Sequence, residues 1–251
     1  MAKLNSIVRF LNGELGVGRI PDSSRNGLQV RVPKEIRKVG FAVDASLAVF
    51  EKAKRHGCDL VVVHHGIKWK GLRDRLGTRE KRIAYLRRRR INLYACHLPL
   101  DAHMEFGNNA QLAKILGLED VRKFGRYKGR AIGCSGRFAR PRTLRWIAGR
   151  FRRKINSDCV SLGFGRPGIR TVGIVSGGGS DAISEAAAKG LDCFITGEAP
   201  HHIYHEARDA GLNVIVAGHY ETETVGVKAL MPLVRREFGV RTVFIDLPTP
   251  F

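Results

Sequence analysis

The chain alternates short apolar runs with longer segments in which apolar residues recur at helical spacing. Leu4, Ile7, Val8, Leu11 and Leu15 recur at such spacing and predict a helix. The same spacing or composition predicts further helices at 47–56, 78–90, 110–116, 182–189, 200–210 and 224–238. Short apolar runs predict strands at 28–30, 39–44, 60–63, 91–96, 171–176, 193–195, 214–216 and 243–245. This alternation indicates an α/β protein with mostly parallel sheets.

The run Leu60 to Val63 is followed at once by His64, His65 and Gly66. Four consecutive apolar residues, three of them β-branched, are typical of a strand buried on both faces. Ligands bind just beyond the carboxyl ends of strands in such sheets. The two histidines therefore stand where a site is expected, and a histidine pair on an ordinary loop is the alternative.

Three predicted strands end in side chains that bind metals. They deliver His64 and His65, then His97 and Asp101, then His219 and Glu223. The last two pairs are spaced i, i+4, which places both members on one face of a helical turn. The later pair opens a predicted long helix, whereas Pro99 favours a turn for the earlier one.

Imidazoles and carboxylates without thiolates suit Zn, Fe, Mn, Co or Ni. Five or six such ligands exceed the needs of one tetrahedral zinc. A carboxylate can bridge two cations, so we expect two divalent ions roughly 3.5–4 Å apart, which lower the pKa of bound water and so create a nucleophile. If one pair is structural, the site is mononuclear.

The 251 residues are 43% hydrophobic and 27% charged, which is typical of a globular protein. No apolar run approaches the roughly 20 residues that span a membrane, and no secretory segment opens the chain. We therefore expect a cytoplasmic protein without a membrane partner.

The five cysteines are scattered, odd in number and form no CxxC pair, which argues against a disulfide framework or a cysteine-rich zinc site.

The net charge of +21 favours nucleic acid or a phosphorylated ligand as a partner. No acidic residue occurs between Asp120 and Asp158, where arginines alternate with aromatic residues. That mixture suits single-stranded nucleic acid, and the alternative, which we prefer, is an arginine-rich solvated surface around a small apolar core. The composition shift predicts one α/β domain from 1–120 plus 218–251, carrying the metal site, and a basic inserted α/β domain at 121–217.

Several motifs match one known family in order along the chain. They are Asn26-Gly27-Leu28-Gln29-Val30, Val43-Asp44, His64-His65-Gly66, His97-Leu98-Pro99-Leu100-Asp101, Thr196-Gly197-Glu198 with His201-His202, and Ala217-Gly218-His219-Tyr220 with Glu223. Together they make the chain resemble the NIF-three-like dinuclear metal-centre family, also named the GTP cyclohydrolase type-two homologue family.

The resemblance implies a fold of two interlinked α/β domains and ring-shaped homohexamers. It implies that two divalent ions per subunit are bound by five residues, with His97 beside them as a ligand or a substrate contact. The implied ligands are His64, His65, Asp101, His219 and Glu223.

These inferences favour a metal-dependent hydrolase of a nucleotide or phosphorylated substrate, with His97 moving protons. Opening of the purine ring of a GTP-like molecule is one candidate reaction by resemblance, and phosphoester hydrolysis is another. The alternatives are a nucleic-acid-binding ring and a metal carrier or regulator without turnover.

Three further features each have two interpretations. The turn 176–181 either binds an anion through its N–H groups or is a tight strand-to-helix connection. Asp44 either orients a metal-binding histidine or caps the following helix. Glu198, His201, His202 and His205 form a polar cluster that we do not expect to bind a second metal.

Overall fold

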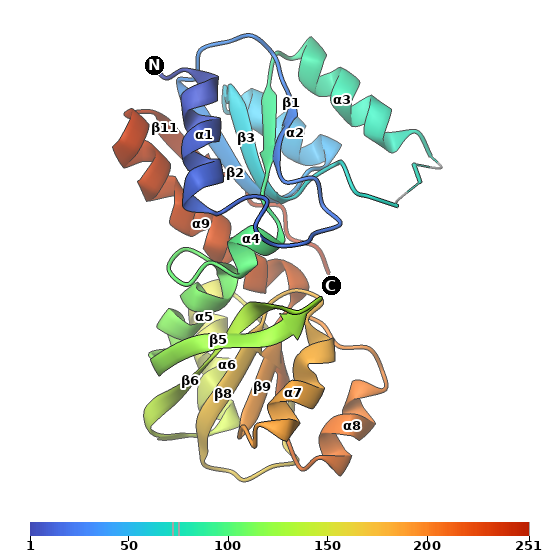
Figure 1. Cartoon of the computed structure of the whole chain (residues 1–251), viewed down its shortest axis with the longest axis vertical. Coiled ribbons are helices and arrows are strands. Elements are labelled where there is room, and N and C mark those ends of the chain that lie inside the picture. Colours follow the sequence, from blue (N-terminus) through green and yellow to red (C-terminus); the bar gives the residue numbers. More distant parts are fainter. Residues whose placement is uncertain (72, 75, 251) are drawn as a thin grey trace. The chain divides into compact units, whose positions relative to one another are not determined.

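The computed structural model describes residues 1–71, 73, 74 and 76–250, which form two compact units (Figure 1). The first unit comprises Met1–Leu100 and Val227–Leu247, and the second comprises Asp101–Gly226 with the segment that starts at Pro248. The chain passes from one unit to the other within α4 (Leu98–Asp101) and α9 (His219–Phe238), and again after Leu247. The predicted boundaries at 120/121 and 217/218 fall inside the second unit.

The first unit contains a five-stranded sheet in the order β1-β4-β3-β2-β11. Its strands are β1 (Gly27–Val30), β2 (Lys38–Asp44), β3 (Leu60–His65), β4 (Asn92–Ala95) and β11 (Arg241–Phe244). The last four are mutually parallel, and β1 pairs antiparallel with β4 at the edge. The unit also contains α1 (Leu4–Glu14), α2 (Leu47–Arg55) and α3 (Thr78–Arg88).

Strand β3 lies in the middle of this sheet and is almost fully buried. Leu60 to Val63 are all at most 1% exposed, as expected for a central parallel strand. The register of β2 and β3 places Asp44 opposite His65 at the carboxyl end of both strands. Helix α2 begins at its predicted cap, because the Ser46 hydroxyl accepts a hydrogen bond from the Val49 N–H at 3.2 Å.

The second unit contains a six-stranded mixed sheet in the order β5-β6-β8-β9-β10-β7. Its strands are β5 (Glu119–Tyr127), β6 (Arg130–Arg142), β7 (Val160–Leu162), β8 (Ile169–Val175), β9 (Cys193–Thr196) and β10 (Asn213–Val216). Parallel pairing is confined here to β8, β9 and β10, and β5, β6 and β7 join antiparallel.

Helices cover both faces of this second sheet. Side chains of α5 (Asn108–Leu116) and α6 (Leu144–Ile155) pack in one apolar cluster, and those of α7 (Ile183–Ala188) and α8 (Ile203–Asp209) pack in another. Successive residues of β9 alternate between them: Phe194 joins the second cluster and Ile195 the first. A short 3-10 helix, η1 (Ser180–Ala182), precedes α7.

The predicted alternation of helices and strands is confirmed, with three local differences. Strands β5, β6 and β7 and helix α6 were not predicted. Residues 200–202 precede α8 instead of belonging to it. The turn predicted at Pro99 is wrong, because Pro99 lies in the short helix α4, whose first turn tolerates a residue without an N–H.

Two other features bear on the expectations from composition. None of the helices in the described part of the chain is long and apolar enough to cross a membrane. Cys58, Cys96 and Cys193 are buried, form no disulfide among the described residues and pack as small apolar side chains. The segment 68–77, which its sequence indicates to be a basic loop with one tryptophan, contains residues 72 and 75, which lie outside the described residues.

Candidate functional site

Three histidines gather at the carboxyl ends of β3 and β4 in the first unit. His64 and His65 are the last residues of β3, and His97 follows β4. One ring nitrogen from each lies within 4.8 Å of the others, which is close enough to share a cation. His64 is buried and the other two are half-buried.

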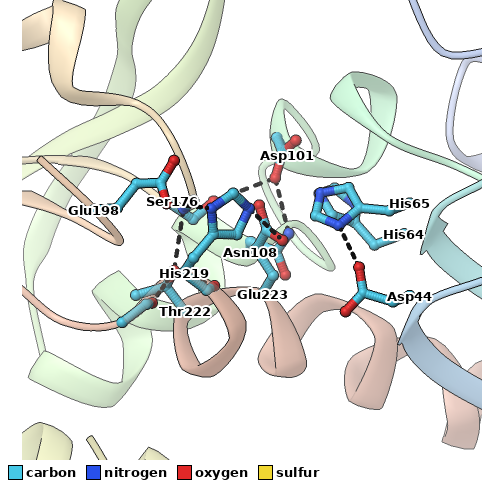
Figure 2. Close-up of polar contacts among 12 residues, drawn as sticks. Asp44, His64, His65, Asp101, Asn108, Ser176, Glu198, His219, Thr222 and Glu223 are labelled. Atoms are coloured by element: carbon cyan, nitrogen blue, oxygen red, sulfur yellow. Dashed lines mark hydrogen bonds and ion pairs between the residues drawn. The ribbon is translucent and has the colours of Figure 1, made fainter. Parts of the chain in front are cut away.

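Hydrogen bonds fix which nitrogen His64 and His65 turn toward a ligand. The Nδ1 of His64 lies 3.0 Å from the Cys96 carbonyl oxygen, and the Nδ1 of His65 lies 2.9 Å from Asp44 Oδ1 (Figure 2). Both partners are acceptors, so each Nδ1 carries the proton and each Nε2 carries the lone pair. Histidines that bind metals are oriented in this way, which supports the orienting role for Asp44.

His97 is held by a buried carboxylate from the turn before β1. Asp22 Oδ1 accepts from His97 Nδ1 at 3.0 Å, and the Asp22 side chain is 3% exposed. The same carboxylate accepts from the side chain of Asn26 and from the backbone N–H groups of Ser24 and Leu98. Burial works to raise the pKa of Asp22, but hydrogen bonding to His97, its charge and the other donors outweigh it and lower that pKa to about 2.

In the second unit, Asp101 ends α4 and is held by two donors. Asp101 Oδ1 accepts from Asn108 Nδ2 at 2.8 Å and from the Ser176 hydroxyl at 3.2 Å (Figure 2). The Asn108 Oδ1 in turn accepts from the N–H of Gly226 in α9 at 2.9 Å. Asn108 therefore ties Asp101 to α9, and a carboxylate oxygen of Asp101 lies within 4.8 Å of one of Glu223.

His219 and Glu223 share one face of the first turns of α9, as their spacing predicted. His219 Nε2 lies 3.3 Å from Glu223 Oε2, and His219 Nδ1 lies 3.1 Å from Glu198 Oε2 (Figure 2). Glu198 therefore orients His219 as Asp44 orients His65, a role that the sequence did not predict.

The turn after β8 approaches the Glu223 carboxylate so closely that any side chain larger than glycine would displace it. Gly177 has a φ of +59°, and a Cβ added there would lie 2.1 Å from Glu223 Oε1 and 3.1 Å from His219 Nε2. Gly177 therefore leaves the space in which these two side chains meet.

The first two amide groups of this turn are engaged. The N–H of Ser176 donates to Asn109 Oδ1 at 2.7 Å, and that of Gly177 donates to Thr222 Oγ1 at 3.1 Å. These bonds contribute to the tight strand-to-helix connection, and the anion site at 176–181 stays a prediction.

The donor sets of the two units differ in composition, but both consist of nitrogen or oxygen donors of the kinds that divalent metals accept. The first unit supplies three imidazoles, and the second supplies one imidazole and two carboxylates, without a thiolate in the groups found among the described residues. Nitrogen and oxygen donors oriented by outer carboxylates fit a divalent transition metal or zinc. His201 and His205 make an edge-to-face contact with 5.9 Å between ring centroids, but no group of candidate metal ligands found among the described residues includes them.

Known proteins resemble the chain over nearly its whole length. The sequence pattern of the Duf34/NIF3 (NGG1p interacting factor 3) family matches residues 2–250. A Pyrococcus abyssi protein named "GTP cyclohydrolase 1 type 2 homolog" is 48% identical over 244 residues, 97% of each chain. An Archaeoglobus fulgidus protein of the same name is 44% identical over 246 residues, 98% of each chain.

The solved structures agree. The crystal structure of TTHA1606 from Thermus thermophilus matches with a TM-score of 0.90 and 39% identity, over 98% of this chain and 99% of that one. These likenesses confirm both the family resemblance inferred from the motifs and the α/β fold it implied. The chain belongs to the Duf34/NIF3 family.

Proposed function

We propose that the chain is a divalent-metal-dependent hydrolase of a nucleotide or phosphorylated substrate. In this proposal two cations are bound by His64, His65, Asp101, His219 and Glu223. Bound cations would supply Lewis acidity and activation of water at neutral pH. The observation that carries the proposal is the fixed Nδ1–H of the clustered histidines, which leaves each Nε2 as the ligand atom.

His97 is assigned the proton transfers of the reaction. Its Nδ1 donates to Asp22, so its Nε2 is the nitrogen that takes a proton from an attacking group or returns one to a leaving group. Asp22 is a positioning residue, since it acts through His97. The name of the relatives points to a GTP-like molecule as the first substrate to test, and a phosphoester is the second.

The proposal places all five ligands in one centre. Asp101 follows His97 by only four residues along the chain, through α4. Metal content tests this: His65→Ala and Glu223→Ala would each lower the binding of both cations in equilibrium dialysis. Two independent half-sites would behave differently, because each variant would keep one ion bound at full affinity.

Activity is tested with metal-loaded protein on a panel of nucleotides and phosphoesters. Turnover that depends on metal and is lost in Asp101→Ala and His97→Ala supports the hydrolase. The matched control is His56→Ala, at an exposed histidine that ends α2. A metal-loaded protein that is inert across the panel contradicts the hydrolase and favours a carrier or regulator.

A second candidate function is nucleic-acid binding by the basic surface of β5, β6 and α6. Lys128 lies over the Tyr127 ring at 5.2 Å, and Tyr127 is 37% exposed. Such a pairing of cation and exposed ring suits stacking with a single strand. Binding that falls steeply with salt and weakens in an Arg152→Gln, Arg153→Gln variant, with metal content unchanged, supports it; equal binding by the variant contradicts it.

The ring-shaped homohexamer implied by the family resemblance is also a proposal. Light scattering coupled to size-exclusion chromatography tests it directly. A mass six times that of one chain supports the ring, and a monomer contradicts it.

A further inference from the structure

A pocket of about 290 Å³ opens in the first unit between the segment after β3 and the start of α3. Its lining combines aromatic, apolar and strongly cationic side chains. Among the described residues it is lined by Gly66, Ile67, Trp69, Arg73, Asp74, Leu76, Thr78, Arg79 and Arg82.

The pocket is next to the histidine cluster of the same unit. Gly66 directly follows His65, and the Trp69 indole N–H donates to the Gly66 carbonyl at 2.7 Å. The Trp69 ring centroid lies 5.0 Å from that of His97 and 6.1 Å from that of His65. Trp69 is therefore a wall shared by the pocket and the candidate metal site.

The charges in the pocket favour an anion. Three arginines line it against one carboxylate, Asp74, and that carboxylate is committed to the start of α3. Asp74 Oδ1 accepts from the N–H and hydroxyl of Thr78, and Oδ2 accepts from the N–H of Arg79. Arg79 and Arg82 are one helical turn apart and half-buried, so their guanidinium groups face less competition from water than fully exposed ones.

Lys68, next to Trp69 in the sequence, also lies in a positive electrostatic field. The pKa of Lys68 is lowered by burial and by the positive charges of Arg25, Arg87 and Arg79. An anion beside Trp69 and α3 would relieve this repulsion between cations.

We propose that this pocket binds the phosphate group of the substrate, held by Arg79, Arg82 and Arg73. Arginine matches phosphate because its planar fork donates two parallel hydrogen bonds. The volume of about 290 Å³ lies just below the roughly 300–1,000 Å³ typical of sites for whole small molecules. A phosphate or pyrophosphate therefore fits, while the rest of the ligand extends past Trp69 toward His65 and His97. Binding of the anion by the arginines does not depend on the proposed function. Only the statement that the bound molecule reacts at His65 and His97 rests on it.

The test measures binding of inorganic pyrophosphate to the metal-free full chain by isothermal titration calorimetry. We expect saturable binding that is weakened about tenfold or more in Arg82→Gln, because a charged hydrogen-bond donor is lost. The control is Arg9→Gln, which removes the same charge from an exposed helical position in α1 of the same unit. Arg73→Gln is a second test, since its exposed position outside a helix leaves folding intact.

A single-tryptophan variant gives an independent readout. The chain has two tryptophans, so Trp146→Phe leaves only Trp69 to report on the pocket. Pyrophosphate is expected to change its fluorescence with the same affinity as in calorimetry. Absence of pyrophosphate binding, or equal weakening in Arg82→Gln and Arg9→Gln, overturns the pocket.

Failure of the hydrolase proposal gives a different result. If the chain binds pyrophosphate at these arginines but turns over no substrate, the anion pocket is supported and the hydrolase proposal is contradicted. If Arg82→Gln and Arg73→Gln hydrolyse substrates with unchanged KM, the hydrolase proposal is supported and the anion pocket is contradicted. Metal content is expected to be the same in all these variants, because none of the arginines is a ligand.

Discussion

Substituting Gly177 by alanine tests the candidate metal ligands through a single methyl group. The added Cβ would lie 2.1 Å from Glu223 Oε1, well under the 3.0 Å that real Cβ atoms keep from other heavy atoms. The carboxylate must therefore move by roughly an ångström. Metal–ligand distances are held to within about 0.2 Å, so this displacement removes Glu223 from any coordination sphere it belongs to.

The chain offers a matched control at Gly190. Gly190 has a φ of +61°, against +59° at Gly177, and an added Cβ would find nothing within 4 Å. Both alanines therefore carry the same left-handed backbone strain, about 1–2 kcal/mol, but only one touches the candidate site. We expect Gly177→Ala to weaken metal binding about 10–100-fold and Gly190→Ala to leave it unchanged.

The assay is a competition titration of metal-free protein against a chromophoric chelator, with circular dichroism to show that both variants fold. Thermal unfolding of the metal-free variants checks that each loses backbone stability. Equal metal affinity in the two variants would refute the assignment of Glu223 as a ligand, because the clash would then have no functional consequence.

Three further predictions address the residues behind the ligands. In a double-mutant cycle on urea unfolding, Asp22→Asn and His97→Ala should show a coupling of about 1.5–3 kcal/mol, the value of a charge-assisted hydrogen bond, and additive effects would contradict it. Asn108→Ala should weaken metal binding about tenfold or more, because it releases Asp101, and an unchanged titration would argue against this role. Burial works to raise the pKa of Asp59, but hydrogen bonds from a lysine and two backbone N–H groups lower it below its ordinary 3.8. The stability that Asp59→Asn removes should therefore be largest above that pH and vanish as the pH falls through the lowered value, which urea unfolding at a series of pH values measures.

The sequence located the parallel strands well for a physical reason. Strands such as β3 and β9 are buried on both faces and appear as unbroken apolar runs. Strand β5 escaped prediction because it lies at the edge of its sheet, where only Phe124 and Gly125 are buried and most other positions are charged. Its antiparallel pairing with β6 supplies the order that its own pattern does not show.

The candidate ligands were predictable because they follow strands or open a helix, but the groups that hold them were not. Asp22 lies 75 residues before His97, in a cluster of turn-forming residues where a local role is sufficient. Asn108 stands at the start of α5, where asparagine is common for helical reasons alone. In both cases the partner is set by tertiary structure.

The excess positive charge and the candidate cation site are compatible because electrostatic fields in water are short-ranged. At physiological ionic strength interactions between exposed charges fade beyond about 8 Å, so the nearest groups decide whether a cation binds. The net charge of +21 is carried in part by exposed arginines of α3, β5, β6 and α6, where anions are attracted. Beside three of the four candidate histidines, by contrast, a carboxylate accepts the Nδ1 proton: Asp44 at His65, Asp22 at His97 and Glu198 at His219. These carboxylates raise the basicity of each Nε2 and offset the charge of a bound cation, so one chain can attract an anionic substrate broadly and still hold metal locally.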